Sequence, residues 1–367
     1  MVMRGLSVAL VGPLPPPAGG MANQTRQLAE LLQREGAQVE LVQTNAPHRP
    51  VWLSGVRGLR AMARLMPYLL ALWRAAGRND VMHLMANSGW SWHLFAAPAI
   101  WIAWLRGQPV VVNYRGGEAG EFLARSARLV RVSMRRTASL VVPSGFLQEV
   151  FARHGMPARI VANIVDLQRF RPADGVGTAG EPCILVARNL EAVYDNATAL
   201  RAFAHVLQAC PRARLTIAGT GPEAESLRRL ADELGIGARV EFAGRLDRDA
   251  MAERLRQSQV ALNPSRADNM PNSVLEAMAS GVPVVSTAVG GVPYIVSDGV
   301  TALLVPAGDA HAMAEAVTRV LQDDSLAARL RAAALKEVQR YTWARVLPEL
   351  ASVYREAVPA AMSRHAT

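Results

Sequence analysis

Short apolar runs alternate with amphipathic stretches along the whole chain. In the first half, an apolar run at residues 6–12 precedes a stretch at 21–36 with helical spacing, and a second apolar run follows at 38–45. A strand, helix, strand rhythm of this kind predicts a parallel sheet covered by helices on both faces. Further strands of this series are predicted at residues 109–115, 139–144 and 158–166.

The same rhythm starts again near residue 183. Six more apolar runs predict strands at residues 183–189, 213–219, 239–244, 259–265, 283–288 and 301–307. Between the two series lies RPADGVGTAGEP, which has the polar, Gly- and Pro-rich composition of a linker. The predicted fold class is therefore α/β, with two doubly wound domains. We expect these parts: a first domain at 1–172, a linker at 173–182, a second domain at 183–340, and a C-terminal helical segment at 341–367 that packs back on the first domain.

The composition is that of a globular protein. A chain of 367 residues, 51% hydrophobic and 19% charged, fits about two domains of roughly 150 residues each. The two cysteines, Cys183 and Cys210, offer no disulfide framework and no zinc-binding spacing, so we expect a reducing compartment and no structural metal. The N-terminus passes directly into an apolar run with one early charge, Arg4, which does not fit a signal peptide. We therefore expect the protein to stay inside the cell.

The net charge of +10 is concentrated in the first half of the chain. Residues 1–175 carry a net +11, and residues 176–367 a net −1. Codon composition explains why the basic residues include a single lysine, Lys336, but it would affect both halves alike. The excess charge therefore predicts an anionic partner, either a membrane surface or a charged substrate. Nucleic acid is disfavoured, because the first half has no zinc finger, aromatic RNA-binding signature or recognisable recognition helix.

Tryptophan clusters in the same half, with six of the seven tryptophans between Trp52 and Trp104. Arginines surround the apolar stretch at residues 58–78, namely Arg57, Arg60, Arg64, Arg74 and Arg78. Trp and Arg beside apolar surface are typical of an interfacial helix, whereas the apolar run at 95–105 is too short to cross a bilayer. Ordinary helices of an α/β domain, with their apolar stripes on the sheet, are the alternative. The coincidence of charge and tryptophan favours contact with a membrane surface.

The most specific stretch runs from Asn263 to Gly291. A predicted strand ends in a loop, after which Asn272 and Ser273 open a helix that Gly281 stops. The first turn of a helix offers unpaired N–H groups to an anion. Asp268 on the loop and Glu276 one turn inside the helix could hold hydroxyls on two parts of one ligand whose phosphates rest on those groups, as in a sugar nucleotide. The alternative is an acidic first turn that balances the helix dipole.

Here the sequence resembles the retaining glycosyltransferases of family 4. The resemblance rests on an acidic residue, seven intervening residues and a Glu, from Asp268 to Glu276, then EAMASGVPVV and the pair Gly290-Gly291. It extends over nearly the whole chain, through GPLPPPAGG, VPSGF, NIVDLQRF, ARN and LTIAGTGPE. The resemblance implies two facing Rossmann-like domains of the GT-B type, with the donor in a deep interdomain cleft.

The resemblance also implies roles in the second domain. Glu276 would hold the nucleotide ribose, and Asp268, where the family usually has Glu, would face the transferred sugar. The backbone N–H groups of Asn272, Ser273 and Val274 would meet the diphosphate. Asn269 and Met270 complete the implied donor-binding loop.

Two further roles follow from the same resemblance. Gly19 and Gly20 would let the first domain's backbone approach the diphosphate without a side chain in the way; a plain Pro-Gly turn is the alternative. Arg188 matches an arginine at the end of the second domain's first strand, where it would neutralise the departing nucleotide. A solvated arginine is the alternative there.

The sequence departs from the family pattern at several positions. The lysine that usually follows the arginine is missing from RNLEAVYDNAT, so Arg188 acts alone or with an arginine from elsewhere. Where many members have a histidine, PVVVNYRGGE offers Arg115 and Glu118, which we expect in the cleft with unassigned catalytic roles. His83 is either the missing imidazole or a satisfied histidine at a strand end. Tyr294 replaces a Glu often found past the paired glycine.

The expected function is metal-independent, retaining transfer of a sugar from a UDP- or GDP-sugar to a lipid-linked or polysaccharide acceptor, in cell-surface polysaccharide biosynthesis. No Asp-x-Asp motif is present, and no cofactor is expected besides the donor itself. We expect a cytoplasmic protein, peripheral on the inner membrane face through its basic first domain. Alternatives are a sugar-nucleotide 2-epimerase or phosphorylase of the same fold, or a non-catalytic scaffold. A dinucleotide dehydrogenase is disfavoured, because GPLPPPAGG lacks the G-x-G-x-x-G spacing.

Overall fold

The computed structural model describes residues 2–16, 19–46, 57–173 and 181–358. The chain forms two compact units, and each is described by itself. Unit 1 holds Met1–Asn163 together with Val346–Thr367, and unit 2 holds Ile164–Arg345. The end of the chain therefore belongs to the same unit as its beginning. Trp52 and residues 174–180 of the predicted linker lie outside the described residues.

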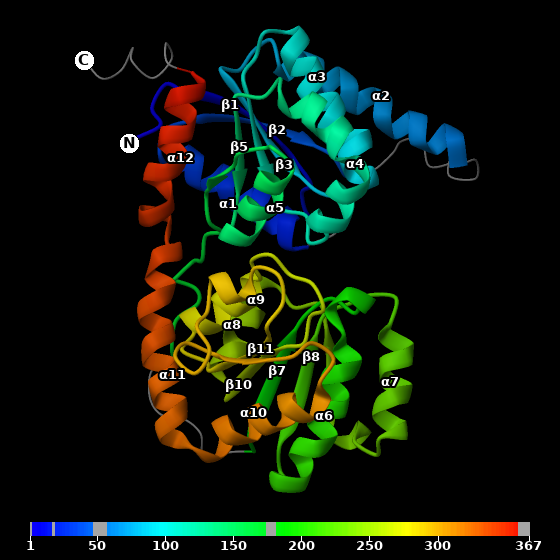
Figure 1. The fold of residues 1–367 in the computed structure, drawn as a ribbon, viewed down its shortest axis with the longest axis vertical. Helices are drawn as coiled ribbons and strands as arrows, with labels where there is room; N and C mark the ends of the chain where they lie inside the picture. The colour runs from blue at the N-terminus through cyan, green and yellow to red at the C-terminus, as the bar shows by residue number, and fades with distance from the viewer. Residues whose placement is uncertain (1, 17–18, 47–56, 174–180, 359–367) are drawn as a thin grey trace. The chain divides into compact units, whose positions relative to one another are not determined.

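Unit 1 is built on a six-stranded parallel sheet with the order β2-β1-β3-β4-β5-β6 (Figure 1). Its central strands are buried on both faces, which explains why they read as continuous apolar runs in the sequence. The strands are β1 (Ser7–Gly12), β2 (Gln38–Gln43), β3 (Val81–Ala86), β4 (Val110–Tyr114), β5 (Ser139–Val142) and β6 (Arg159–Ile160).

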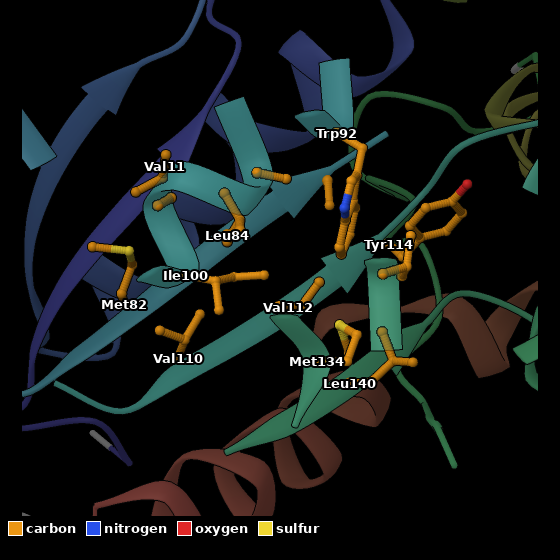
Figure 2. Packing of buried hydrophobic residues seen from close by; sticks show 14 of the residues in the cluster. Val11, Met82, Leu84, Trp92, Ile100, Val110, Val112, Tyr114, Met134 and Leu140 are labelled. Atoms are coloured by element: carbon orange, nitrogen blue, oxygen red, sulfur yellow. The ribbon is translucent and has the colours of Figure 1, made fainter. Parts of the chain in front are cut away.

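One face of this sheet carries a large apolar core (Figure 2). Alternate strand residues such as Leu84 and Val112 point into it, and they meet Leu72, Ile100 and Met134 from the covering helices. The helices on this face include α2 (Arg57–Ala75), α3 (Ala97–Leu105), α4 (Ala119–Met134) and α5 (Gly145–Arg153), with a single π-helical turn at Trp92–Ala96 before α3.

The opposite face of the sheet has a different character, because its strand residues include buried polar side chains. His83 and Asn113 alternate with core residues and so point to this side. Two more helices of unit 1 are α1 (Gly20–Arg34), which packs on β1 and β2, and α12 (Trp343–Ala357), whose Tyr354 contacts His83. The helix nearest the C-terminal end of the described residues thus completes the first unit.

Unit 2 repeats the architecture with a second six-stranded parallel sheet, in the order β12-β11-β10-β7-β8-β9. Its first strand in the chain lies in the middle of the sheet, so the strand order reverses beside it. The strands are β7 (Cys183–Ala187), β8 (Arg214–Ala218), β9 (Val240–Gly244), β10 (Val260–Asn263), β11 (Val284–Thr287) and β12 (Leu303–Val305).

Helices cover both faces of this second sheet. Phe203 of α6 (Asn196–Ala209) and Val317 of α10 (Ala310–Gln322) share a buried cluster with Ile184 and Ile217 of the strands. On the other face, Leu255 of α8 (Arg248–Arg256) and Val274 of α9 (Asn272–Ala279) line a small pocket with strand residues. The remaining helices are α7 (Ala224–Glu233) and α11 (Asp324–Glu337).

The predicted fold class is confirmed, since both series of apolar runs form parallel sheets between helices. One predicted strand is much shorter than expected: of residues 158–166, only Arg159–Ile160 pairs in the sheet. The segment leaves the sheet because its polar groups find other partners. Asn163 binds Arg115, and the N–H of Val165 donates to the carbonyl of Tyr341 at 2.9 Å.

Candidate functional site

Arg188 follows directly after β7, at the carboxyl end of the central strand of unit 2. Its Nε donates to Oδ1 of Asn263 at 2.8 Å, and its terminal Nη2 forms an ion pair with Oδ2 of Asp268. The guanidinium also lies over the ring of Tyr194, 5.1 Å from the centroid. A carboxylate, an amide and an aromatic ring thus hold this guanidinium in place. The sequence predicted that Arg188 acts alone or with an arginine from elsewhere, and it did not show these three contacts.

Asn263, the last residue of β10, is itself held on both sides of its amide. Its Nδ2 donates to Oγ of Ser286 on β11 at 2.9 Å, and its Oδ1 accepts from Oγ of Ser265 at 2.8 Å. Ser265 is held in turn by Thr287, whose hydroxyl donates to its carbonyl at 2.6 Å. The strand ends therefore preorganise the arginine through buried polar side chains.

Asp268 lies on the loop between β10 and α9, with 12% of its side chain exposed. Burial raises the pKa of its carboxyl, and the charge of Arg188 and the N–H of Asn269 oppose that shift. The paired glycine holds the loop from outside: the N–H of Gly291 donates to the carbonyl of Asp268 at 2.9 Å. Gly290 has a φ of +51°, and a Cβ there would overlap that same carbonyl oxygen. Close backbone approach thus explains why glycine stands at this position.

Helix α9 begins four residues after Asp268, as the sequence predicted, with Pro271 at its N-cap. Of the three amides expected to meet a diphosphate, that of Val274 donates to the carbonyl of Pro271 at 3.2 Å. Asn269 and Met270, on the loop before it, are buried. Asn272 and Ser273 form the first turn and are partly exposed.

Glu276 lies one turn inside α9 and is partly buried. Burial raises the pKa of its carboxyl to about 7, against the opposing charges of Arg248 and Arg188. Two acidic groups with raised pKa values and one fixed arginine thus share the carboxyl edge of the unit 2 sheet, where open α/β sheets bind their ligands.

The predicted residues of unit 1 have two different environments. Gly19 is the N-cap of α1 and Gly20 its first residue, and a Cβ on either would meet nothing within 4 Å. Glu118 occupies the N-cap position of α4, and its side chain is exposed. Arg115, by contrast, is drawn into the protein: Nε donates to Asn113 Oδ1 at 2.9 Å, and Nη1 donates to Gln24 Oε1 at 2.8 Å.

The same Nη1 of Arg115 also donates to Oδ1 of Asn163. Burial lowers the pKa of this guanidinium to about 10. Arg115 therefore joins α1, β4 and the chain beyond β6, which is a structural task that its position in the sequence did not reveal.

His83 is a satisfied histidine, as one of the two interpretations predicted, but it lies inside β3 and not at a strand end. It is completely buried in β3, with Nε2 3.0 Å from Asn113 Nδ2 and Nδ1 2.8 Å from Tyr354 Oη. Because Asn113 Oδ1 already accepts from Arg115, its Nδ2 must donate to Nε2, and the His83 proton must lie on Nδ1. Burial, with the charge of Arg115, lowers the pKa of His83 to about 3, so the ring is neutral.

Several site residues were missed from the sequence. Asn263 and Tyr194 both contact Arg188. Asn263 gives no local signal, because it lies 75 residues from Arg188 in the chain, and nothing in the segment after Arg188 shows that the Tyr194 ring packs against the guanidinium. Arg266 donates its N–H to the carbonyl of Val193 at 2.8 Å, and its Nε pairs with Asp195 at 2.9 Å. The structure thus brings an arginine to the segment where the family usually has lysine.

The residues that the structure describes contain neither a cluster suited to a metal ion nor a membrane-spanning helix. No group of three or more His, Cys, Asp or Glu side chains among these residues is placed to hold a metal ion. None of the helices in the described part of the chain combines the length and hydropathy needed to span a bilayer.

Two family models match the chain: "Glycosyl transferases group 1" at residues 174–337 and "Glycosyl transferase 4-like domain" at residues 19–164. A D-inositol 3-phosphate glycosyltransferase of Frankia alni is 30% identical over 280 residues, 71% of this chain and 68% of that protein. Another, of Mycolicibacterium paratuberculosis, is 34% identical over 58% of this chain and 50% of that protein. The chain spans about half the length of the first curated relatives it matches.

Solved structures show the same fold over nearly the full length. Sucrose-phosphate synthase from Thermosynechococcus elongatus has a TM-score of 0.79 and 22% identity, covering 97% of this chain and 100% of its own. HepE of Anabaena in complex with UDP-glucose has a TM-score of 0.76 and 18% identity, covering 95% of this chain and 99% of its own. By its sequence relatives and its two sheets, this chain belongs to the family 4 glycosyltransferases of the GT-B fold.

Proposed function

We propose that this protein is a retaining, metal-independent glycosyltransferase that uses a UDP- or GDP-sugar. The observation that carries the proposal is the cluster of Arg188, Asp268 and Glu276 at the carboxyl edge of the unit 2 sheet. It offers one fixed cation for a diphosphate and two carboxyls for hydroxyl groups. Relatives named as glycosyltransferases, and a structural neighbour solved with UDP-glucose, support the same assignment.

The proposed reaction exchanges one bond to the anomeric carbon for another. The acceptor oxygen bonds to that carbon on the face that the nucleotide leaves, while the bond from carbon to phosphate oxygen breaks. The hydroxyl proton of the acceptor passes to the departing phosphate. Arg188, whose Nε is held by Asn263, neutralises the charge that grows on this phosphate. Asp268 faces the transferred sugar, and Glu276 accepts hydrogen bonds from the ribose.

The first test is ligand-induced stabilisation. UDP and GDP are titrated separately against the purified protein, each with Mg²⁺ and with EDTA, while thermal unfolding is followed. A nucleotide at about a hundredfold above its dissociation constant adds roughly 2.7 kcal/mol. We expect one nucleotide to raise the melting temperature equally with and without the metal. If neither does, the donor-site proposal is wrong and a scaffold role gains support.

Transfer itself is tested by product analysis. Donor is incubated with and without acceptor lipid, and NMR follows the sugar. Retained anomeric configuration in a new glycoside supports the proposal, whereas a changed sugar in the donor-only sample identifies a 2-epimerase. Arg188→Ala and Glu276→Ala are each expected to lower the transfer rate by on the order of a hundredfold or more. Wild-type rates in both variants contradict this site.

A second part of the proposal concerns the acceptor, which we take to be lipid-linked or a polysaccharide at the inner membrane face. Helices α2, α3 and α4 of unit 1 pack side by side on the sheet (Figure 1). Their outer surface exposes large apolar side chains, and we call this surface the aromatic–basic face. Its exposed apolar residues are Met66, Leu70, Trp73, Trp104, Leu105, Leu129 and Val132.

Arginines accompany these apolar residues. Arg106 lies 4.9 Å from the ring centroid of Trp73, and Arg136 lies 5.0 Å from that of Trp104. Further exposed arginines of the face are Arg74, Arg78, Arg125, Arg128 and Arg135. Between residues 57 and 136 the acids are Asp80, which bonds to Ser7, and the exposed Glu118 and Glu121 at the start of α4. For Arg57, Arg60 and Arg64 the structure describes the helix but not the side chains. Apolar surface with a strong positive charge fits an anionic lipid headgroup layer.

Vesicle binding tests this surface. The wild-type protein should sediment with vesicles of phosphatidylglycerol and phosphatidylcholine, and less so as salt rises. Arg74→Gln and Arg78→Gln should each weaken binding by about 1 kcal/mol. Trp73→Ala with Trp104→Ala should weaken it further, whereas Val300→Ala, at an exposed apolar site of unit 2, should not. Self-association without vesicle binding would instead make the face an interface between copies of the chain.

A further inference from the structure

Arg188 and Asp268 form the most enclosed ion pair of the described residues, with 11% and 12% of their side chains exposed. The Nε of Arg188 donates a hydrogen bond to Asn263. The ion pair with Asp268 uses Nη2, one of the two terminal groups of the guanidinium. Tyr194 covers one side of the same guanidinium. An anion that binds Nη2 of Arg188 must therefore compete with Asp268 for that group.

We infer that Asp268 is an internal competitor for Arg188, which weakens the binding of a free nucleoside diphosphate relative to the intact sugar nucleotide. The inference rests on the proposed function, in which a diphosphate binds Arg188. A diphosphate that draws Nη2 away leaves the enclosed Asp268 carboxylate without its counter-charge, which is costly in a site from which water is largely excluded.

The transferred sugar changes this balance. Its hydroxyl groups are hydrogen-bond donors, and the proposed function places them at Asp268. They replace the guanidinium as partners of the carboxylate, so the intact donor satisfies both members of the pair. After transfer the sugar is gone and the nucleoside diphosphate faces an unsatisfied carboxylate again. Asp268 thereby favours donor binding and promotes product release with the same charge.

The substitution Asp268→Asn tests this inference. Asparagine keeps the size and one acceptor oxygen but removes the charge that competes for Arg188. Isothermal titration with UDP and with GDP should show a dissociation constant about tenfold lower than in the wild type. The matched control is Asp268→Glu, which keeps the charge and should not bind the nucleotide more tightly. Far-UV circular dichroism checks that both variants are folded.

A double-mutant cycle separates competition from simple repulsion between Asp268 and the phosphates. If Asp268 acts through Arg188, the gain from Asp268→Asn shrinks when Arg188→Ala is also present. Simple repulsion predicts a gain that is equal or larger without the arginine, and that outcome overturns the inference. Tight nucleotide binding by the wild type, with no lower dissociation constant in Asp268→Asn, also overturns the inference. If the wild type binds neither nucleotide, the proposed function itself falls.

Discussion

Tyr354 of α12 and His83 of β3 form a buried hydrogen bond across 271 residues of sequence, with 2.8 Å between Oη and Nδ1. Both side chains are completely buried. Because His83 carries its proton on Nδ1, the ring donates and the tyrosine oxygen accepts. The bond starts a polar chain that continues through Asn113 to Arg115, from the last helix of the chain to the carboxyl edge of the unit 1 sheet.

Tyr354→Phe is expected to destabilise unit 1 by about 1–3 kcal/mol, because it leaves the buried N–H of His83 without an acceptor. Chemical denaturation followed by tryptophan fluorescence measures the loss, since six of the seven tryptophans fall within residues 1–163. Tyr341→Phe, in unit 2, is the control for the loss of a tyrosine hydroxyl, because no described residue bonds to its hydroxyl, and it should leave the stability of unit 1 unchanged. Equal losses in the two variants would show that the contact with His83 adds nothing.

The same histidine should make unit 1 sensitive to acid. Its pKa falls from 6.5 to about 3 on folding, so the unfolded chain takes up the proton first as the pH drops. The stability that neutral His83 contributes is present above pH 6.5 and is lost progressively below it, by up to about 5 kcal/mol. His83→Gln should be less stable at pH 7 but should show a flatter pH dependence between pH 6.5 and 4.

Gly290→Ala should disturb the Asp268 loop more than its small size suggests. The new methyl group would overlap the carbonyl oxygen of Asp268, in addition to the strain of a positive φ. Gly299→Ala isolates the second effect, because Gly299 has a φ of +69° and open space around it. The control should lose about 1–2 kcal/mol, and Gly290→Ala should lose more, together with nucleotide binding. Unchanged nucleotide affinity in Gly290→Ala would separate the paired glycine from the site.

Glu276 should couple nucleotide binding to pH. With a pKa raised from 4.5 to about 7, its carboxyl contributes stability below pH 4.5 that is lost as the pH rises through 7, by up to about 3 kcal/mol. Ribose hydroxyls donate to the ionised form, so binding should release a proton and tighten from pH 6 to pH 8. Glu276→Gln should be stabilised relative to the wild type as the pH rises over 4.5–7, and its weaker binding should depend less on pH than that of the wild type. A pH-independent affinity in the wild type would contradict the ribose role.

The sequence predicted the sheets and the acidic loop because their signals are local. A buried parallel strand is an apolar run, and the spacing from Asp268 to Glu276 places a loop and a helix start within one segment. The sequence did not show that Arg188 contacts Asn263 and Asp268, because these residues lie 75 and 80 positions further along the chain. The contacts of Arg115 were likewise not visible in the sequence: its guanidinium donates to amide oxygens of Gln24, Asn113 and Asn163, and two of these residues lie 91 and 48 positions away.

Helix α12 follows the strands of both units, yet from Val346 onward its residues belong to unit 1. During synthesis, β3 and β4 emerge long before Tyr354, so His83 lacks its acceptor until the residues of unit 2 have been made. Unit 2 has all of its residues, up to Arg345, before that moment and can fold first, although it follows most of unit 1 in the sequence. A nascent chain truncated before Val346 would therefore hold every residue of unit 2, together with a first unit whose buried polar side chains are exposed.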